Sequence, residues 1–202
     1  MVIATDDERI VEAAKGFGAK AVMTSPEHPS GTDRIAEAAL AYPDHPLIIN
    51  VQGDEPLISP VLIDELATTL RQNSHISMIT AAAPIHDAEQ IKDPNVVKVV
   101  LDVHGDALYF SRSVLPFVRD TGVVTKHRRH LGIYGFRREF LHEFVSWPPS
   151  MLEMTESLEL LRALENGTRI RVVLTDDISP GVDTLQQAHA VERLMQSQRS
   201  AS

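Results

Sequence analysis

The stretch Leu47–Pro60, LIINVQGDEPLISP, decides the fold. It opens with the apolar run Leu47–Ile49 and reaches Gly53, which two carboxylates follow, Asp54 and Glu55. A short apolar run bounded by turn residues predicts a strand buried on both faces. In open α/β sheets, ligands bind beyond the carboxyl ends of such strands. The stretch therefore predicts a carboxylate pair at a ligand site, although a solvated acidic turn has the same pattern.

The chain before and after this stretch alternates between strand and helix patterns. Strands are predicted at residues 2–5, 20–23 and 76–85, in addition to the one that begins at Leu47. The helices between them carry apolar stripes: Ile10, Val11 and Ala14; Ile35, Ala36, Ala39 and Leu40; Leu62, Ile63, Leu66 and Leu70. This alternation predicts a parallel sheet with helices on both faces.

The pattern changes in the second half. Residues 96–102 and 107–111 predict a β-hairpin, and residues 130–136 predict a long strand. A helix over 138–146 precedes a capping box, which begins one helix running to Asn166-Gly167 with an apolar stripe. A last strand at 170–174 leads to a C-terminal helix.

Composition limits the class of protein. A chain of 202 residues suits one domain, and its net charge of -9 argues against a nucleic-acid-binding surface. The absence of cysteine excludes disulfides and thiolate metal sites. No apolar run is long enough to cross a membrane, and the N-terminus lacks the pattern of a signal peptide. We therefore expect a cytoplasmic protein.

Two acids occupy similar positions, since Asp54 and Asp183 each lie between a predicted strand and a predicted helix. If both strands belong to one sheet, the carboxylates reach one cleft, where phosphate oxygens would complete a Mg²⁺ site. The alternative is that Asp183 only caps the last helix. At Ser30-Gly31-Thr32, two hydroxyls and the free N–H groups of a helix start would attract an anion, although plain N-capping explains the same residues.

Basic residues gather in the second half, at positions 112, 128, 129, 130, 137 and 138. A local basic cluster in an acidic chain suits a small anionic substrate, and solvated surface charge is the alternative. The nine histidines show no metal-ligand spacing. Glycine-rich nucleotide loops and the G-x-S-x-G elbow are also missing.

Seven segments in order resemble one family, the 3-deoxy-manno-octulosonate (KDO) cytidylyltransferases. These segments are Ile3-Ala4-Thr5-Asp6, His28–Arg34 (HPSGTDR), Asn50–Pro56 (NVQGDEP), Asn95–Val100 (NVVKVV), Ala107–Arg112 (ALYFSR), His130–Arg137 (HLGIYGFR) and Gly181–Thr184 (GVDT). The resemblance covers nearly the whole chain. It implies a three-layer α/β/α, Rossmann-like nucleotidyltransferase fold, with a mostly parallel mixed sheet and a hairpin and dimerisation region at about 94–137.

The resemblance also implies a reaction: CTP and KDO give CMP-KDO and pyrophosphate. It places Mg²⁺ on Asp54 and Asp183, and the nucleotide beside Ser30, Gly31, Thr32 and Gln52. It places the KDO carboxylate and hydroxyls beside Arg112, His130, Tyr134 and Glu159. Such enzymes are typically cytoplasmic homodimers that serve lipopolysaccharide synthesis.

Two departures from the family pattern matter. The family begins with a strand and a phosphate-binding loop rich in Arg, Ser, Gly and Lys, and this chain starts after them. We therefore expect residues 1–202 to form one N-terminally truncated cytidylyltransferase domain that binds CTP poorly. Second, the family often has Gln where this chain has Leu160, which cannot bond a sugar hydroxyl. A catalytically defective remnant and a cytidylyltransferase for another acidic sugar, such as sialic acid, are the alternatives.

Overall fold

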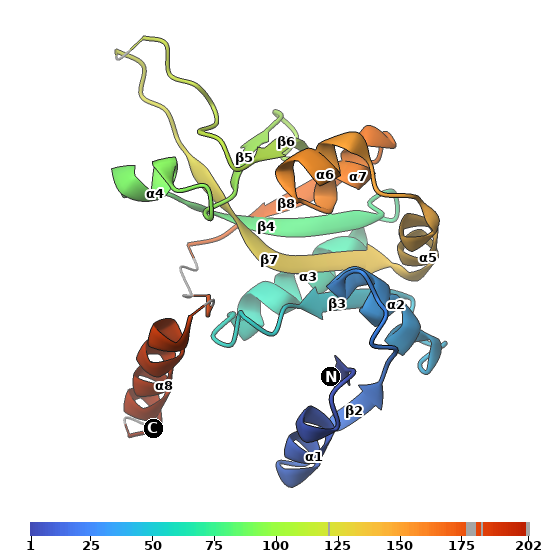
Figure 1. Cartoon of the computed structure of the whole chain (residues 1–202). Helices are drawn as coiled ribbons and strands as arrows, with labels where there is room; N and C mark the ends of the chain where they lie inside the picture. Colours follow the sequence, from blue (N-terminus) through green and yellow to red (C-terminus); the bar gives the residue numbers. More distant parts are fainter. Residues whose placement is uncertain (121, 177–180, 183, 201–202) are drawn as a thin grey trace.

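The computed structural model describes residues 1–120, 122–176, 181–182 and 184–200 (Figure 1). Strands β1 (Val2–Thr5) and β2 (Lys20–Met23) form a parallel pair. A six-stranded sheet has the order β6-β5-β7-β4-β8, with β3 also paired to β7. Its strands are β3 (Leu47–Val51), β4 (Met78–Pro84), β5 (Lys98–Leu101), β6 (Ala107–Ser111), β7 (Arg128–Arg137) and β8 (Ile170–Leu174).

The larger sheet is mixed, as expected. Strand β7 is antiparallel to β3, β4 and β5, whereas β4 and β8 are parallel. It follows that β3, β4, β5 and β8 all run in one direction. The expected hairpin is formed by β5 and β6, and Gly105 takes a φ of +84° in its turn, a conformation that glycine adopts without steric cost.

Eight helices are described along the chain. They are α1 (Glu8–Gly16), α2 (Gly31–Leu40), α3 (Pro60–Gln72), α4 (Ala88–Lys92), α5 (Arg138–Ser146), α6 (Met151–Glu156), α7 (Leu160–Glu165) and α8 (Leu185–Ser200). Side chains of Asp7, Ser30 and Ser150 accept hydrogen bonds from backbone N–H groups at three of the helix starts. These local caps are the reason that helix starts were readable from the sequence.

The core forms two layers, one on each face of the sheet, and β4 contributes to both. Ile79, Ala81 and Ala83 pack with Leu62, Leu66 and Leu70 of α3. Met78 and Ala82 point the other way, into a cluster with Phe140 and Phe144 of α5 and Leu161 of α7. Since successive side chains of a strand alternate between faces, one central strand supports helices on both sides. The three-layer α/β/α arrangement is confirmed.

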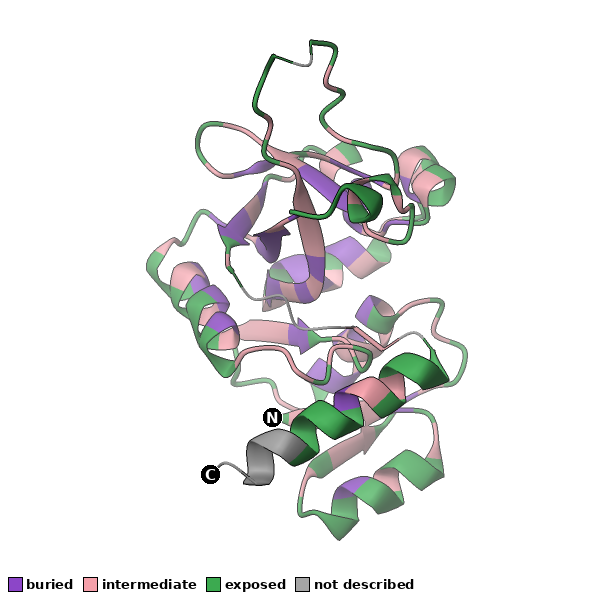
Figure 2. Cartoon of the chain, turned by 90° about the vertical axis from the view of Figure 1, so that its left-hand side faces the viewer, coloured by how far each residue is buried: buried purple, intermediate pink, exposed green. Residues whose placement is uncertain are grey.

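Three expectations about packing were wrong in part. Strand β3 contacts both core layers, through Ile48 on one side and Ile49 on the other, but both side chains are only half-buried. The reason is that β3 is paired along one edge only within the described residues. Leu40, expected to face inward, is 65% exposed. The β1–β2 pair also forms its own sheet, and Figure 2 shows that α1 beside it is mostly exposed.

The expected single helix after Ser150 is two helices. Ser157 has a φ of +53°, which breaks the helical hydrogen bonding between α6 and α7. A left-handed serine is uncommon, and neither glycine nor proline marks the break in the sequence. The break matters because Glu159, a predicted site residue, lies directly after it at the start of α7.

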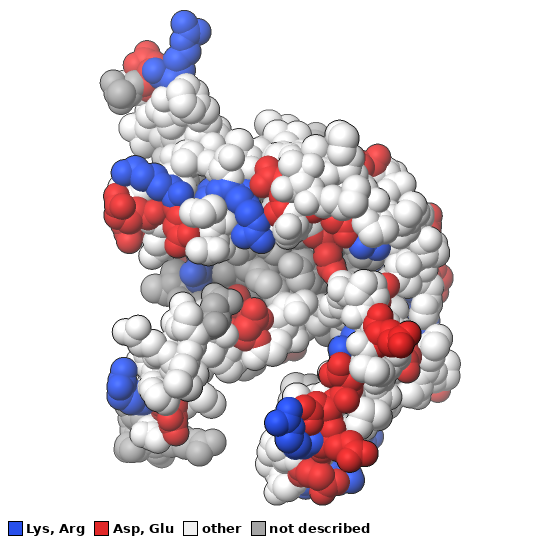
Figure 3. All heavy atoms as spheres, viewed as in Figure 1, with Lys and Arg blue, Asp and Glu red and all other residues white. Residues whose placement is uncertain are grey.

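Between β6 and β7, the described residues of segment 112–127, which are 112–120 and 122–127, project from the body as an arm (Figure 1). It exposes the apolar side chains Val114, Phe117, Val123 and Val124. On the face shown in Figure 3, acidic and basic side chains are interspersed, and many acidic ones gather over α1. Among the described residues, no helix has both the length and the apolar character needed to span a bilayer.

Candidate active site

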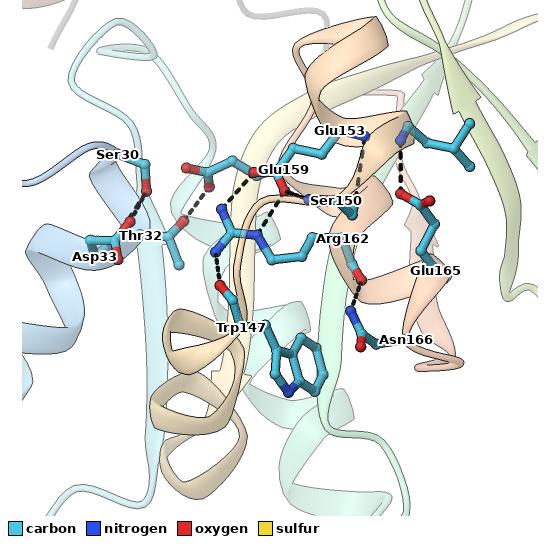
Figure 4. Close-up of polar contacts among 11 residues, drawn as sticks. Ser30, Thr32, Asp33, Trp147, Ser150, Glu153, Glu159, Arg162, Glu165 and Asn166 are labelled. Carbon is cyan, nitrogen blue, oxygen red and sulfur yellow. Dashed lines mark hydrogen bonds and ion pairs between the residues drawn. The ribbon is translucent and has the colours of Figure 1, made fainter.

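The first turn of α2 brings together residues from distant parts of the chain. Thr32 is buried, and its Oγ1 donates a hydrogen bond of 2.6 Å to Glu159 Oε2 (Figure 4). Gly31 lies close to Gln52, the residue that follows β3, since a Cβ added at Gly31 would be 3.3 Å from Gln52 Oε1. A larger residue at position 31 would require the end of the Gln52 side chain to move by a few tenths of an ångström. Gly31, Thr32, Gln52 and Glu159 form one neighbourhood.

Ser30 has a more local role at this turn. Its Oγ accepts a hydrogen bond from Asp33 N at 3.2 Å and lies 2.7 Å from Asp33 Oδ2. These contacts are those of an N-cap, so the capping explanation accounts for the hydroxyl of Ser30. The backbone N–H groups of the helix start remain the part of this turn that suits an anion.

The loop after β3 approaches both β7 and the segment before α8. A Cβ on Gly132 would meet Gln52 Cγ and Glu55 Cγ, each at 3.6 Å. On the other side, Val182 N donates to the backbone oxygen of Asp54 at 2.7 Å. The loop that carries the two carboxylates is thus held between the middle of β7 and residues 181–182.

Tyr134 lies where these segments meet. Its partner across β3 and β7 is Asn50. Burial raises the pKa of the Tyr134 phenol, and the negative charges of Glu159, Asp54 and Glu55 raise it further. The phenol therefore stays protonated at neutral pH and can donate a hydrogen bond. Three carboxylates from two separate segments are therefore close enough to Tyr134 to raise the pKa of its phenol.

His130 lies on the same strand as Tyr134, with 5.5 Å between their ring centroids. The ring of Phe110 packs edge-on against it at 5.2 Å. Burial lowers the pKa of His130 to about 3, so the imidazole is neutral at pH 7. Its Nε2 is 2.9 Å from the hydroxyl of Thr80 on β4. A neutral ring suits a sugar hydroxyl better than it suits a carboxylate.

Glu159 reaches Thr32 because the chain turns sharply at Ser157. The next residue, Leu160, is only 2% exposed and belongs to the core cluster. An apolar residue fits that environment. Behind it, Arg162 and Glu153 form a buried ion pair at 2.5 Å (Figure 4). The Arg162 guanidinium also lies 4.8 Å from the centre of the Phe144 ring.

Arg112 has a structural role in addition to any contact with substrate. Its guanidinium donates to the backbone oxygens of Glu156 at 2.7 Å, Pro94 at 3.0 Å and Ser157 at 3.4 Å. Those bonds join the hairpin to the turn that precedes Glu159. An arginine has five N–H donors, so two remain after these bonds for a carboxylate.

The expectation of one basic cluster facing a substrate is wrong for two of its members. Arg137 donates to the backbone oxygens of Leu70, Asn73 and Ile76, at and beyond the end of α3. Arg138 donates in the same way to Ala39, Tyr42 and His45, at and beyond the end of α2. Basic side chains satisfy the free carbonyl groups at helix ends, and these two arginines join β7 and α5 to the ends of α3 and α2.

Asp183 lies outside the described residues, although its neighbour Val182 is hydrogen bonded to the Asp54 backbone. The Asp54 carboxylate is exposed, and carboxylate oxygens are the ligands that Mg²⁺ prefers. The donors present therefore fit a Mg²⁺ ion that also binds substrate phosphates. Within the described ranges, no cluster of three or more acidic or histidine side chains could hold a metal by itself.

Sequence reasoning missed two polar residues of this region, Asn50 and Thr80. Asn50 is 6% exposed, and its Nδ2 has no partner within the described part of the chain. A buried amide without a partner is costly, so a ligand or water is expected at this atom. The signal was available, because Asn50 interrupts an apolar strand. Thr80 gave no such signal, since threonine is common in strands.

One surface cavity lies away from these residues. It has a volume of about 260 Å³ and is bounded by residues that include His75, Trp147 and Arg169. None of the nucleotide-, sugar- or metal-binding residues predicted from the sequence lines this cavity. The candidate site is therefore identified by the residues of separate sequence motifs that lie close together, and not by this cavity.

Comparison with known proteins agrees with the geometry. The cytidylyltransferase family model matches residues 1–170. A 3-deoxy-manno-octulosonate cytidylyltransferase of Pseudomonas fluorescens is 49% identical and covers 98% of this chain and 82% of its own length. One of Marinobacter nauticus is 48% identical and covers 97% of this chain and 81% of its own.

Solved structures support the same assignment. CMP:2-keto-3-deoxy-manno-octonic acid synthetase complexed with CTP matches with a TM-score of 0.92 and 38% identity, over 98% of this chain and 80% of that one. A 4-diphosphocytidyl-2C-methyl-D-erythritol synthase from Anaerococcus prevotii has a TM-score of 0.60 at 15% identity, which shows a shared fold alone. The chain belongs to the 3-deoxy-manno-octulosonate cytidylyltransferase family.

Proposed function

We propose that this protein transfers CMP from CTP to KDO, giving CMP-KDO and pyrophosphate. The observation that carries the proposal is the hydrogen bond between Thr32, beside the expected nucleotide, and Glu159, beside the expected sugar. This contact supports the proposal because it would bring the nucleotide and the sugar within reach of one reaction. The relative with 38% identity was solved with CTP, which supports the choice of nucleotide.

The reaction joins an oxygen of the sugar to the α-phosphorus of CTP. The anomeric hydroxyl oxygen of KDO forms the new bond, the bond from the α-phosphorus to pyrophosphate breaks, and the hydroxyl proton is lost. Most of the catalytic effect in such transfers comes from positioning and from charge stabilisation. In this protein, the residues around Tyr134 would supply the positioning.

Each half of the site has its own residues. Ser30, Gly31, Thr32 and Gln52 would bind the nucleotide, with the N–H groups of the α2 start facing an anionic group. Arg112, His130, Tyr134 and Glu159 would bind KDO. The carboxylate of Glu159 accepts hydrogen bonds and carries a negative charge, so it suits a sugar hydroxyl and not the KDO carboxylate.

Asp54 and Asp183 would hold Mg²⁺, which neutralises charge on the phosphates when it is bound. Without the cation, two carboxylates next to a triphosphate would repel it. Asp54 is supported as a ligand by its exposure, and by Gly181 and Val182, which pack against its loop.

The biological setting is part of the proposal. CMP-KDO would serve lipopolysaccharide synthesis in the cytoplasm. A homodimer is supported by the arm at 112–127, whose exposed Phe117 and Val124 are 82% and 95% accessible. Large exposed apolar side chains on a projecting segment are typical of an interface, and we propose a second copy of this chain as the partner.

The test is a pyrophosphate-release assay with CTP, KDO and MgCl₂. We expect release that depends on all three components and that falls when N-acetylneuraminate replaces KDO. Asp54→Asn should abolish it, while Asp64→Asn, an exposed aspartate on α3, should not change it. Release of pyrophosphate with N-acetylneuraminate but not with KDO would indicate a cytidylyltransferase for sialic acid. No release with either sugar would indicate a catalytically defective remnant of such an enzyme. The KM for CTP from the same assay tests the expectation that CTP binds weakly.

A further inference from the structure

Thr80 lies beneath the candidate sugar site at an irregularity of the sheet. Along β4, Thr80 pairs with Tyr134, and the next residue, Ala81, pairs with Leu131. The β7 strand therefore holds two additional residues, Gly132 and Ile133, opposite one step of β4. The side chain of Thr80 is fully buried at this bulge.

Three groups surround the Thr80 hydroxyl. Its Oγ1 is 2.7 Å from the backbone oxygen of Ile133, 3.4 Å from that of Leu131 and 2.9 Å from His130 Nε2. A hydroxyl has one hydrogen, and a carbonyl oxygen can only accept. The short contact to Ile133 takes this hydrogen. The oxygen of Thr80 then has to act as acceptor toward His130, so Nε2 carries a hydrogen.

A neutral imidazole has one N–H group. If that group is at Nε2, Nδ1 is an acceptor. No residue of the described ranges is hydrogen bonded to Nδ1 of His130. Nδ1 is therefore the atom through which His130 can bind a ligand, and it can bind only a group that donates a hydrogen.

The surroundings of the ring keep it neutral. Phe110 of β6 and Tyr134 of β7 pack against it, and the raised pKa of Tyr134 keeps the phenol uncharged. On β5, Lys98 directs its ammonium to the backbone oxygens of Asp93 and Arg112. Glu55 packs at Gly132, two residues along β7, and Arg129 precedes His130 in the sequence. Burial is the cause of the low pKa of His130.

We propose that Thr80 is a positioning residue that holds His130 as the Nε2–H tautomer, so that Nδ1 accepts a hydrogen bond from a hydroxyl of the sugar substrate. The tautomer follows from the fold alone, whereas the identity of the donor rests on the proposed function. The proposal assigns His130 to a hydroxyl of KDO and leaves the KDO carboxylate to donors such as Arg112. In this proposal the bulge in β7 contributes to recognition of the sugar, because it places the Ile133 carbonyl oxygen and His130 around the Thr80 hydroxyl.

The tautomer is tested by NMR on protein with ¹⁵N-labelled histidine. The His130 signals are identified as those that disappear in His130→Gln. We expect the Nε2–H pattern of a neutral ring from pH 8 down to about pH 5, since burial disfavours protonation. In Thr80→Val that pattern should be lost or mixed, and in Thr80→Ser it should be kept. An Nδ1–H ring or an imidazolium in the unchanged protein would overturn the proposal, as would an unchanged pattern in Thr80→Val.

Kinetics test the role of the tautomer in recognition. In Thr80→Val, the KM for KDO should rise about tenfold, with the KM for CTP within about twofold, because one hydrogen bond to the sugar is lost. Thr80→Ser should restore the KM for KDO. An equal rise in the KM for KDO in Thr80→Val and Thr80→Ser would overturn the positioning role of Thr80. Equal rises in the KM values for KDO and CTP would also overturn it. If the unchanged protein has no activity with KDO, the proposed function fails, and the NMR experiment still decides the tautomer.

Discussion

Thr32 Oγ1 donates a hydrogen bond of 2.6 Å to Glu159 Oε2, across 127 residues of sequence. The two residues come from the first turn of α2 and the start of α7. Thr32 is 1% exposed and Glu159 is partly buried, so the bond is partly shielded from water. A charge-assisted bond in such a place fixes the carboxylate of Glu159, which is needed if Glu159 is to orient a sugar hydroxyl.

Thr32→Val should therefore weaken recognition of the sugar. Loss of a hydrogen bond to a charged group costs about 1.5–3 kcal/mol, which corresponds to a fall of roughly 10- to 100-fold in kcat/KM for KDO. Steady-state kinetics with each substrate varied in turn would measure it. Thr68→Val, at an exposed threonine of α3, is the control. An unchanged kcat/KM in Thr32→Val would show that this bond does not support catalysis.

The buried pair of Arg162 and Glu153 should contribute strongly to stability. The two side chains are only 7% and 11% exposed. Arg162→Met removes one partner and leaves a buried carboxylate, so the free energy of unfolding should fall by about 3–5 kcal/mol. Urea unfolding followed by circular dichroism would measure the change. Arg169→Met, at an exposed arginine, should have little effect, and an equal loss in both variants would contradict the account.

Glu153 should also make stability depend on pH. Burial opposes ionisation of its carboxyl, but the hydrogen bonds from Arg162 and the Ser150 N–H outweigh burial and hold the pKa below its ordinary value of 4.5. A lowered pKa contributes stability that is present above pH 4.5 and is lost as the pH falls through the pKa of the folded state. Unfolding free energies of Glu153→Gln should therefore depend less on pH below 4.5. A dependence as steep as that of the unchanged protein would refute this.

A substitution at Gly135 tests how closely β7 packs between the two core layers. A Cβ at this position would lie 2.5 Å from Ile79 Cγ2 and 2.9 Å from Leu70 Cδ1. Gly135→Ala should lower the free energy of unfolding by about 1–3 kcal/mol, because the surrounding side chains must move. Gly16→Ala is the matched control, since a Cβ on Gly16 meets nothing within 4 Å. Thermal unfolding that is equally unaffected in both variants would contradict the close packing.

The arm should be the dimer contact. A double substitution, Phe117→Asp with Val124→Asp, places two charges on the exposed apolar side chains and should convert a dimer to a monomer. Light scattering coupled to size exclusion measures the mass directly. Val103→Asp is the control, because Val103 is 95% exposed but lies in the β5–β6 turn. A monomeric unchanged protein, or a dimer that persists in the double variant, would contradict this interface.

Much of the fold was readable because local signals agreed with the tertiary structure. The apolar run at Leu47 predicted a strand, the cap at Ser150 predicted the start of a helix, and the turn at Gly105 predicted a hairpin. Long-range effects were not readable. The break at Ser157 depends on tertiary packing, because serine has no intrinsic preference for a positive φ.

The candidate site was predictable only in part, for a related reason. Motif positions identified Thr32, Gln52 and Glu159, which the structure brings together. The role of Thr80 depends on a bulge that pairs it with residues more than 50 positions away. Arg137 was grouped with a basic cluster in the sequence because a charge does not reveal its partner, and in the structure it donates to backbone oxygens at the end of α3.

The central claim is that this protein joins CMP to KDO. The most direct measurement is mass spectrometry of the products formed from CTP and KDO with MgCl₂, together with the pyrophosphate released. The account predicts CMP-KDO and pyrophosphate in equal amounts, with neither formed by Asp54→Asn. Pyrophosphate without CMP-KDO, or no product from an intact and folded protein, would contradict it.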